Sequence, residues 1–220
     1  MGLPKDTMLF GFADKLTQEQ REYVDSIFDN QLTFVNARSG TGKTTLAVAC
    51  AKLIGKPLVY VFSPVEEDKL GFTPGDVEAK ESKYIQPLID ALKEIREDPR
   101  FALYREDNPD FMKKDAWVTA KSHVFARGTN IKNSTVIVDE AQNFTVSDLR
   151  KLLTRLHDSC TVIVIGHTGQ IDLKNPSMSG FKAYIDHLGG KDYAHVCELN
   201  WNFRGRLAND ADSIGEETVK

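Results

Sequence analysis

The chain has 220 residues, of which 41% are hydrophobic and 27% are charged, and its formal net charge is −4. This composition predicts one sizeable hydrophobic core and excludes a disordered chain, and no apolar run approaches the roughly 20 residues that cross a bilayer, so we expect no membrane contact. The first residues contain no apolar run typical of a secretion signal and the three cysteines are widely spaced, so we expect a cytoplasmic protein.

The N-terminal part of the sequence predicts a helix, a strand and a second helix. Apolar residues recur at helical spacing over 17–29, and Thr17 followed by Gln20 fits a capping box, in which each residue bonds to the backbone of the other. A β-rich run at 32–35 precedes a glycine-bearing segment and a helix that ends at Gly55. This alternation is typical of a unit that packs a helix against a strand.

The middle of the chain begins with an apolar run at 57–62, which predicts a buried strand. Prolines and glycines mark 64–83 as a loop, and a helix follows with Pro87 in its first turn. Residues 97–115 are the least regular stretch, and we interpret them as an insertion before a short strand at 117–120.

The C-terminal part contains two further near-continuous apolar runs, at 135–138 and 161–165, which predict buried strands. Thr145 lies before an amphipathic helix between them, where its hydroxyl can cap the first turn. A helix around 179–188 and a strand around 194–199 complete the pattern.

Continuous apolar strands that alternate with amphipathic helices indicate strands that are covered on both faces. We therefore predict an α/β fold in which one parallel sheet has helices on both faces and forms a single domain. We expect this domain to span 1–208, with the insertion at 97–115, and to be followed by a C-terminal tail at 209–220.

The segment after the first predicted strand follows the P-loop template G-x-x-x-x-G-K-[ST], with Ala37 in place of the first glycine. Its glycines let successive N–H groups turn toward phosphate oxygens, Lys43 can bridge the β- and γ-phosphates, and Thr44 can offer its hydroxyl to Mg²⁺. The alternative is a simple glycine-bearing turn, which does not account for the flanking strand and helix. We predict a site for ATP and Mg²⁺ whose binding residues are Gln20, Ser39, Gly40, Thr41, Gly42, Lys43, Thr44 and Thr45.

Two carboxylates, Asp139 and Glu140, follow the apolar strand at 135–138. Ligands of open α/β sheets bind at the carboxyl ends of the strands, so this pair is expected to lie near the P-loop. Asp139 then holds Mg²⁺ together with Thr44, and Glu140 polarises the attacking water as a general base. The alternative is an acidic helix N-terminus stabilised by the helix dipole.

Two glutamines are weaker candidates for the same site. Gln170 follows the strand at 161–165 and can sense the γ-phosphate or orient water, but it can equally be a turn residue that satisfies backbone groups. Gln20 can contact adenine, although its place in the capping box explains it equally well.

The chain resembles the PhoH-like ATPases, which are relatives of the superfamily-1 helicase core, from about residue 17 to residue 189. The family-specific piece is KLGFTPGD, because Walker motifs alone fit many families. The segments that carry the resemblance are SGTGKTTLAVA at 39–49, KLGFTPGD at 69–76, YIQPLIDAL at 84–92, FARG at 125–128, VIVDEAQN at 136–143 and GQIDL at 169–173.

The resemblance implies a RecA-like fold with strand order 5-1-4-3-2 and ATP at the carboxyl ends of the strands. It places Gln20 where relatives carry an adenine-reading glutamine, Gln170 where they carry a phosphate sensor, and Arg127 at a family arginine of the catalytic site. The chain departs from the family pattern at Ala37, at His167, which replaces an aspartate, and at 202–206, which replaces DVVRH.

The leading functional interpretation is a Mg²⁺-dependent ATPase that couples hydrolysis to single-stranded RNA or DNA, like a helicase. One alternative is a P-loop kinase that phosphorylates a small molecule, although the insertion holds few of the arginines that such a lid uses. The other is a nucleotide-gated assembly module with little turnover.

One RecA-like lobe leaves one side of a bound triphosphate open, so we expect a homo-oligomeric ring, with a hexamer favoured, in which a neighbour donates an arginine. Arg127 is the first candidate and Arg204 and Arg206 follow, although each can be an ordinary surface arginine. Because the net charge is negative, single-stranded nucleic acid is expected on a local basic face. Its candidate residues are Lys113, Lys114, Lys121 and Lys132.

Overall fold

A computed structural model of the chain describes residues 2–4, 7–64, 83–123 and 130–212. Arg127, the KLGFTPGD segment and most of the loop predicted at 64–83 lie outside the described residues. In the part that is described, the elements follow the predicted alternation of helices and strands, and the predicted α/β fold class is confirmed.

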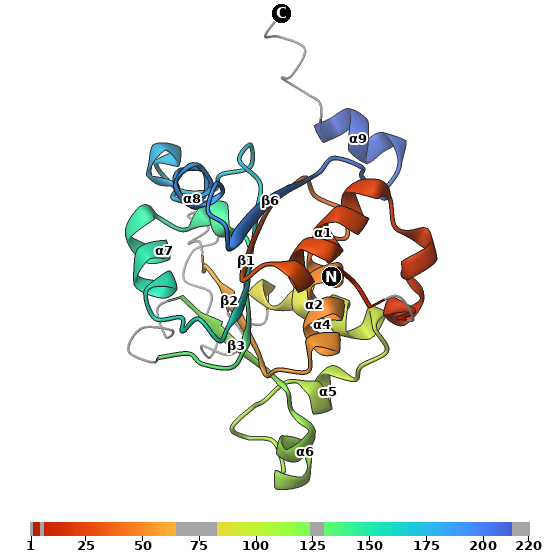
Figure 1. Cartoon of the computed structure of the whole chain (residues 1–220). Coiled ribbons are helices and arrows are strands. Elements are labelled where there is room, and N and C mark those ends of the chain that lie inside the picture. The colour runs from red at the N-terminus through yellow and green to blue at the C-terminus, as the bar shows by residue number, and fades with distance from the viewer. Residues whose placement is uncertain (1, 5–6, 65–82, 124–129, 213–220) are drawn as a thin grey trace, which may run out of the picture.

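A six-stranded sheet in which every neighbouring pair is parallel forms the centre of the described structure (Figure 1). The strand order is β3-β2-β4-β5-β1-β6. The expected order 5-1-4-3-2 is found when β4, β5 and β6 are read as the third to fifth strands, and β3 is an additional edge strand beside β2. The strand bounds are Leu32–Ala37 for β1, Leu58–Phe62 for β2, Val118–Ser122 for β3, Thr135–Val138 for β4, Thr161–Gly166 for β5 and Ala194–Leu199 for β6.

Helices cover both faces of the sheet, with α1, α2 and α4 on one side and α7 and α8 on the other (Figure 1). Short helices α5 and α6 lie in the insertion, and α9 follows β6. The helix bounds are Gln18–Asp29 for α1, Lys43–Ile54 for α2, Gln86–Glu94 for α4, Pro99–Ala102 for α5, Asp110–Asp115 for α6, Val146–Leu153 for α7, Phe181–Leu188 for α8 and Arg206–Asp212 for α9. Single 3-10 turns span Leu9–Gly11, Ala13–Lys15, Ala141–Asn143 and Pro176–Met178.

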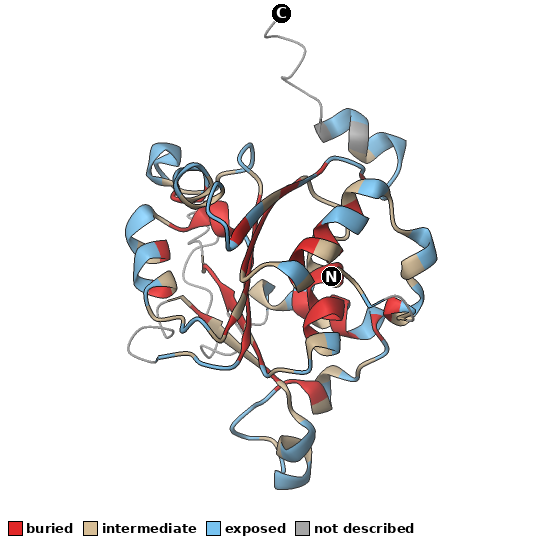
Figure 2. Cartoon of the chain, viewed as in Figure 1, coloured by how far each residue is buried: buried red, intermediate tan, exposed pale blue. Residues whose placement is uncertain are grey.

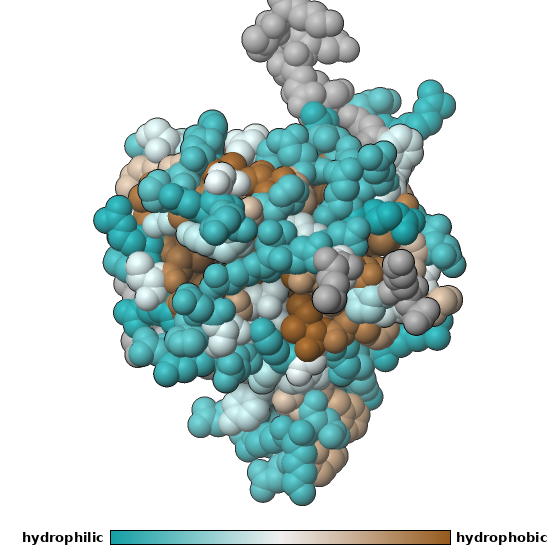
Figure 3. All heavy atoms as spheres, in the orientation of Figure 1, coloured by the Kyte–Doolittle hydropathy of each residue, from teal (hydrophilic) through white to brown (hydrophobic). Residues whose placement is uncertain are grey.

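The core lies in two layers because alternate residues of a strand point to opposite faces of the sheet. Ile137 and Ile163 pack in the layer under α1, α2 and α4, whereas their neighbours Val136 and Val164 pack in the layer under α7 and α8. Buried residues follow the sheet through the middle of the molecule (Figure 2), and the face of the molecule seen in Figure 3 is mainly hydrophilic. This two-sided burial explains why the central strands are continuous apolar runs.

Local signals fix the ends of several helices. Thr17 and Gln20 form the predicted capping box of α1, Thr145 forms another with Asp148 at α7, and Gly55 ends α2 at a φ of +74°. Helix α9 crosses residue 208, the expected end of the domain, and the domain division stays a prediction. Within the described ranges, the helices are all too short or too polar to span a bilayer.

The parallel arrangement determines where a site can form. All six carboxyl ends lie at one edge of the sheet, so the segments that follow β1, β4, β5 and β6 converge although they are far apart in the sequence.

Candidate functional site

The P-loop connects β1 to α2 at this edge of the sheet. Gly40 and Gly42 have φ values of +76° and +79°, a left-handed conformation that glycine adopts without steric cost. Ala37 is instead the buried last residue of β1, in extended backbone, so a methyl group in place of the first glycine is accommodated. Thr41 Oγ1 donates to the carbonyl of Arg38 at 3.0 Å, which stabilises the turn.

Helix α1 is bonded directly to the P-loop. The Gln20 side chain accepts a hydrogen bond from the Thr17 N–H at 3.1 Å and donates one from Nε2 to the Thr41 carbonyl at 2.9 Å. The Tyr23 hydroxyl donates to the Lys43 carbonyl at 3.3 Å. Gln20 therefore has the predicted capping role and also supports the loop, while its contact with adenine stays a prediction.

The two predicted metal ligands meet across the sheet edge. Thr44 Oγ1 donates to Asp139 Oδ2 at 3.0 Å, and the buried Tyr60 hydroxyl donates to the same oxygen at 2.6 Å. Burial, followed by the negative charge of Asp139, raises the pKa of Tyr60 well above its usual value, so this phenol remains a donor at neutral pH. A carboxylate beside a threonine hydroxyl is an oxygen donor set that suits Mg²⁺.

Glu140 is held in an uncommon backbone conformation, with φ at +53° and ψ at +42°. Such geometry in a non-glycine residue costs of order 1–3 kcal/mol and is typical of functional sites. Loss of water around its carboxyl group, and then the negative charge of Asp139, raise the pKa of Glu140, whereas the Lys43 ammonium opposes this shift. A carboxylate with a raised pKa is a better general base near neutral pH.

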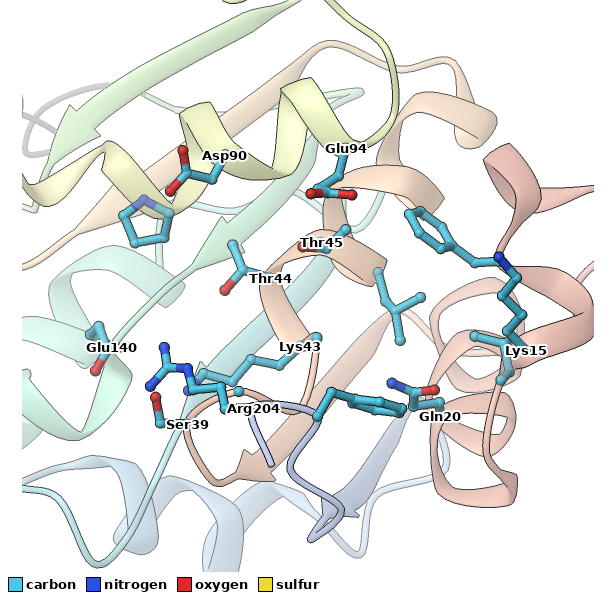
Figure 4. Close-up of a pocket in the computed structure, with 17 residues that line it drawn as sticks. Lys15, Gln20, Ser39, Lys43, Thr44, Thr45, Asp90, Glu94, Glu140 and Arg204 are labelled. Carbon is cyan, nitrogen blue, oxygen red and sulfur yellow. The ribbon is translucent and has the colours of Figure 1, made fainter. Parts of the chain in front are cut away.

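One cavity of about 620 Å³ joins these groups. The P-loop and Glu140 line one part of it, and Figure 4 shows the Lys43 side chain extending toward Glu140, while Gln20 and Lys15 lie at the opposite end. The lining comprises Phe12, Lys15, Leu16, Gln20, Ser39, Gly40, Gly42, Lys43, Thr44, Thr45, Leu46, Pro87, Asp90, Glu94, Glu140, Phe203 and Arg204. This mixture of polar and apolar walls is typical of a site for a small organic anion.

The segment after β6 also lines the cavity, through Phe203 and Arg204. The sequence alone did not predict that this segment belongs to the site. The Phe203 N–H donates to the Gly40 carbonyl at 2.9 Å, and the Arg204 N–H donates to Asn202 Oδ1 at 2.7 Å. The Arg204 guanidinium lies beside Ser39 and points toward Glu140 (Figure 4). The sequence offered Arg204 as a cation for a neighbouring subunit, but in the structure it lines the pocket of its own chain.

Two other candidate site residues, Gln170 and Arg127, are not among the described residues that line the cavity. Gln170 is exposed on the loop after β5, where its N–H donates to the His167 carbonyl at 3.2 Å, and it is not part of the described cavity lining. Its role as a sensor stays a prediction, as does that of Arg127, which lies outside the described residues.

The four lysines proposed as one basic face do not lie together. Lys113 and Lys114 belong to α6, which precedes β3, and Lys132 precedes β4, so these three lie toward the amino ends of the strands. Lys121 lies near the carboxyl end of β3, opposite Val61. A parallel sheet separates residues that precede a strand from those that end one, so the prediction of a single face formed by these lysines is wrong.

A RecA-like parallel sheet, a P-loop and an acidic pair at its strand ends place the protein in the class of P-loop NTPases. The family model of the PhoH-like proteins matches residues 13–210, and the chain belongs to this family.

Among curated relatives, the chain is 35% identical to a PhoH-like protein of Mycobacterium leprae over 189 residues, which are 83% of this chain and 52% of the relative. It is 36% identical to the protein PhoH of Escherichia coli K12 over 177 residues, which are 78% of this chain and 48% of that protein. The chain thus spans about half the length of these relatives.

A solved structure, the large terminase of the thermophilic bacteriophage D6E in complex with ADP, matches with a TM-score of 0.51 at 13% identity. The match covers 91% of this chain and 48% of the terminase chain, and at this identity it shows a shared fold alone.

Proposed function

We propose that this domain binds ATP with Mg²⁺ and hydrolyses it. The observation that carries the proposal is that Lys43, Thr44 and Glu140 line one cavity and that Thr44 is bonded to the buried Asp139, although more than 90 residues separate the P-loop from the acidic pair. Each group matches one requirement of phosphoryl transfer, namely phosphate binding, metal binding and activation of water.

Thr44 Oγ1 and Asp139 Oδ2 are the atoms that would hold Mg²⁺, either directly or through water. The ion would neutralise charge on the β- and γ-phosphates and make the γ-phosphorus more electrophilic.

The protein groups account for the proton and the developing charge. As the water oxygen bonds to the γ-phosphorus, its proton passes to the Glu140 carboxylate and the bond from phosphorus to the β–γ bridging oxygen breaks, giving ADP and phosphate. Lys43 and the Arg204 guanidinium place positive charge on the same side of the cavity, where it stabilises negative charge that builds on the phosphate oxygens.

We further propose that single-stranded RNA or DNA regulates this turnover and that the chain acts as a homo-oligomeric ring. Family membership supports this proposal. Trp201 supports it too, because its side chain is 64% exposed, two residues before Phe203, and a base can stack on such a ring.

Phosphate release from ATP·Mg²⁺ tests the hydrolysis. Lys43→Ala is expected to lower turnover at least about 10³-fold, because it removes the P-loop cation that bridges the β- and γ-phosphates. Lys182→Ala is the matched control, since this lysine forms an exposed ion pair with Asp186 on α8 and should leave turnover unchanged. Normal turnover in Lys43→Ala would refute the assignment of the site.

A further inference from the structure

A single 3-10 turn, Ala141–Asn143, follows the acidic pair and carries two buried side-chain amides. Gln142 is 1% exposed and Asn143 is 5% exposed. A buried amide has to satisfy both its donor and its acceptor, so the partners of each indicate what the turn positions.

Gln142 lies between Glu140 and the loop after β5. Its Nε2 donates to Glu140 Oε2 at 2.6 Å, and its Oε1 accepts from the His167 N–H at 3.0 Å. The second bond determines the orientation of the amide: a backbone N–H can only donate, so the oxygen has to face His167 and the NH₂ group has to face Glu140.

We infer that Gln142 is a positioning residue for hydrolysis, which fixes one carboxylate oxygen of Glu140 so that the other is free to take the proton of the attacking water. This inference rests on the proposed ATP hydrolysis. Gln142 does not line the described cavity and therefore acts on the reaction through Glu140 rather than by touching substrate.

The geometry around Glu140 explains why such a residue is needed. The backbone of Glu140 is anchored, because its N–H donates to Asp139 Oδ1 at 2.9 Å, but its side chain still has rotatable bonds. Misplacement of a catalytic group by about 1 Å can cost about 10²-fold in rate, so a fixed carboxylate makes a measurable difference.

The position of His167 is itself fixed from a second strand end. The next N–H, that of Thr168, donates to Asn36 Oδ1 at 3.1 Å, and Asn36 is the penultimate residue of β1. Gln142 thus connects the base to a loop that is anchored beside the start of the P-loop.

The test replaces Gln142 by residues of similar size. Gln142→Met removes both hydrogen bonds and is expected to lower kcat about 10- to 100-fold while the Kd for ATP stays within about twofold. Gln142→Glu can still accept from His167 but cannot donate to Glu140 when ionised, so a similar loss of kcat is expected. If either variant folds poorly, the other remains informative, and thermal unfolding of both identifies such a failure.

Asn143→Leu is the matched control. Asn143 belongs to the same turn and bonds to the same loop, where its Nδ2 donates to Asp172 Oδ2 at 3.1 Å and its Oδ1 accepts from the Asp172 N–H at 2.8 Å. Its side-chain amide bonds to Asp172 rather than to the Glu140 carboxylate. Its backbone N–H donates to the Glu140 carbonyl at 2.9 Å, a bond that the substitution leaves in place, so kcat should fall less than about threefold. An equal loss in Asn143→Leu and Gln142→Met would mean that the turn as a whole is responsible, and would overturn the inference.

A double-mutant cycle separates positioning from general damage. In a Glu140→Gln background, Gln142→Met should lower the remaining turnover no further, because the group that it positions is already lost. An additive loss would contradict the inference. Full kcat in Gln142→Met beside an active wild type would overturn the inference alone, whereas an inactive wild type would overturn the proposed function as well.

Discussion

The P-loop at 37–44 and the segment at 200–204 line the same cavity but reach it in different ways. The P-loop is a contiguous motif between a strand and a helix, and its glycines, lysine and threonine act together. The later segment has no such motif and arrives only because β6 lies beside β1 in the sheet. One part of this site is therefore encoded by a local sequence motif, and another part depends on the topology of the sheet.

The comparison is tested most strongly at Arg204. If the pairing of β6 with β1 places the Arg204 guanidinium at the phosphates, Arg204→Ala should lower kcat about 10²-fold or more. The Kd for ATP should change much less, because the guanidinium mainly stabilises the negative charge that develops on the phosphate oxygens in the transition state. Arg204→Lys should recover part of the loss. Steady-state phosphate release and equilibrium nucleotide binding give the two quantities.

Mixed samples show whether Arg204 acts within its own chain. Lys43→Ala subunits carry an intact Arg204, so adding them to Arg204→Ala subunits should restore no turnover. Recovery of activity in the mixture would show that a neighbour supplies the arginine.

A smaller effect is expected at Phe203, whose ring lines the cavity with Phe12 and Leu16. If the nucleobase stacks there, Phe203→Ala should weaken ATP binding about tenfold, the lower part of the range for base–aromatic stacking. Inorganic tripolyphosphate has no base, so its affinity should stay unchanged, and Phe203→Tyr should bind ATP normally. Equal losses for both ligands would assign Phe203 to the shape of the P-loop instead.

The contact between the two segments is tested at Gly40. A methyl group built there would lie 2.5 Å from Asn202 Oδ1 and 2.9 Å from Arg204 Cγ, and φ is already +76°. Gly55 is a matched control, because its φ is +74° but a methyl group would meet nothing within 4 Å. Gly55→Ala should cost about 1–2 kcal/mol in the free energy of unfolding. Gly40→Ala should cost more and should also weaken ATP binding, as denaturant unfolding and nucleotide titration would show.

The fold was predictable because the spacing of apolar residues and the positions of turn and cap residues indicate the same helices and strands. The capping pair Thr17 and Gln20, the C-cap Gly55 and the buried runs at 135–138 and 161–165 are local signals, and the structure has elements at each. The position of β3 in the sheet was not predictable, because the local sequence of an edge strand does not indicate which strand it pairs with.

The residues of the site also divide into those that were predictable from the sequence and those that were not. Lys43, Thr44, Asp139 and Glu140 were predictable because strand ends and contiguous motifs identify them. Tyr60 was missed because it reads as one more apolar strand residue, and its bond to Asp139 depends on the pairing of β2 with β4. The rule that places Asp139 at a strand end also applies to β6, and it could have identified Phe203 and Arg204.

The cavity draws its walls from residues between Phe12 and Arg204, nearly the whole described chain. No partly folded fragment that lacks α1 or the segment after β6 can present this complete surface to a nucleotide. A ligand that binds only the native state stabilises it by about 2.7 kcal/mol at 100 times its Kd. Nucleotide binding should therefore protect the domain cooperatively, from its first helix to its last strand, against thermal unfolding and proteolysis.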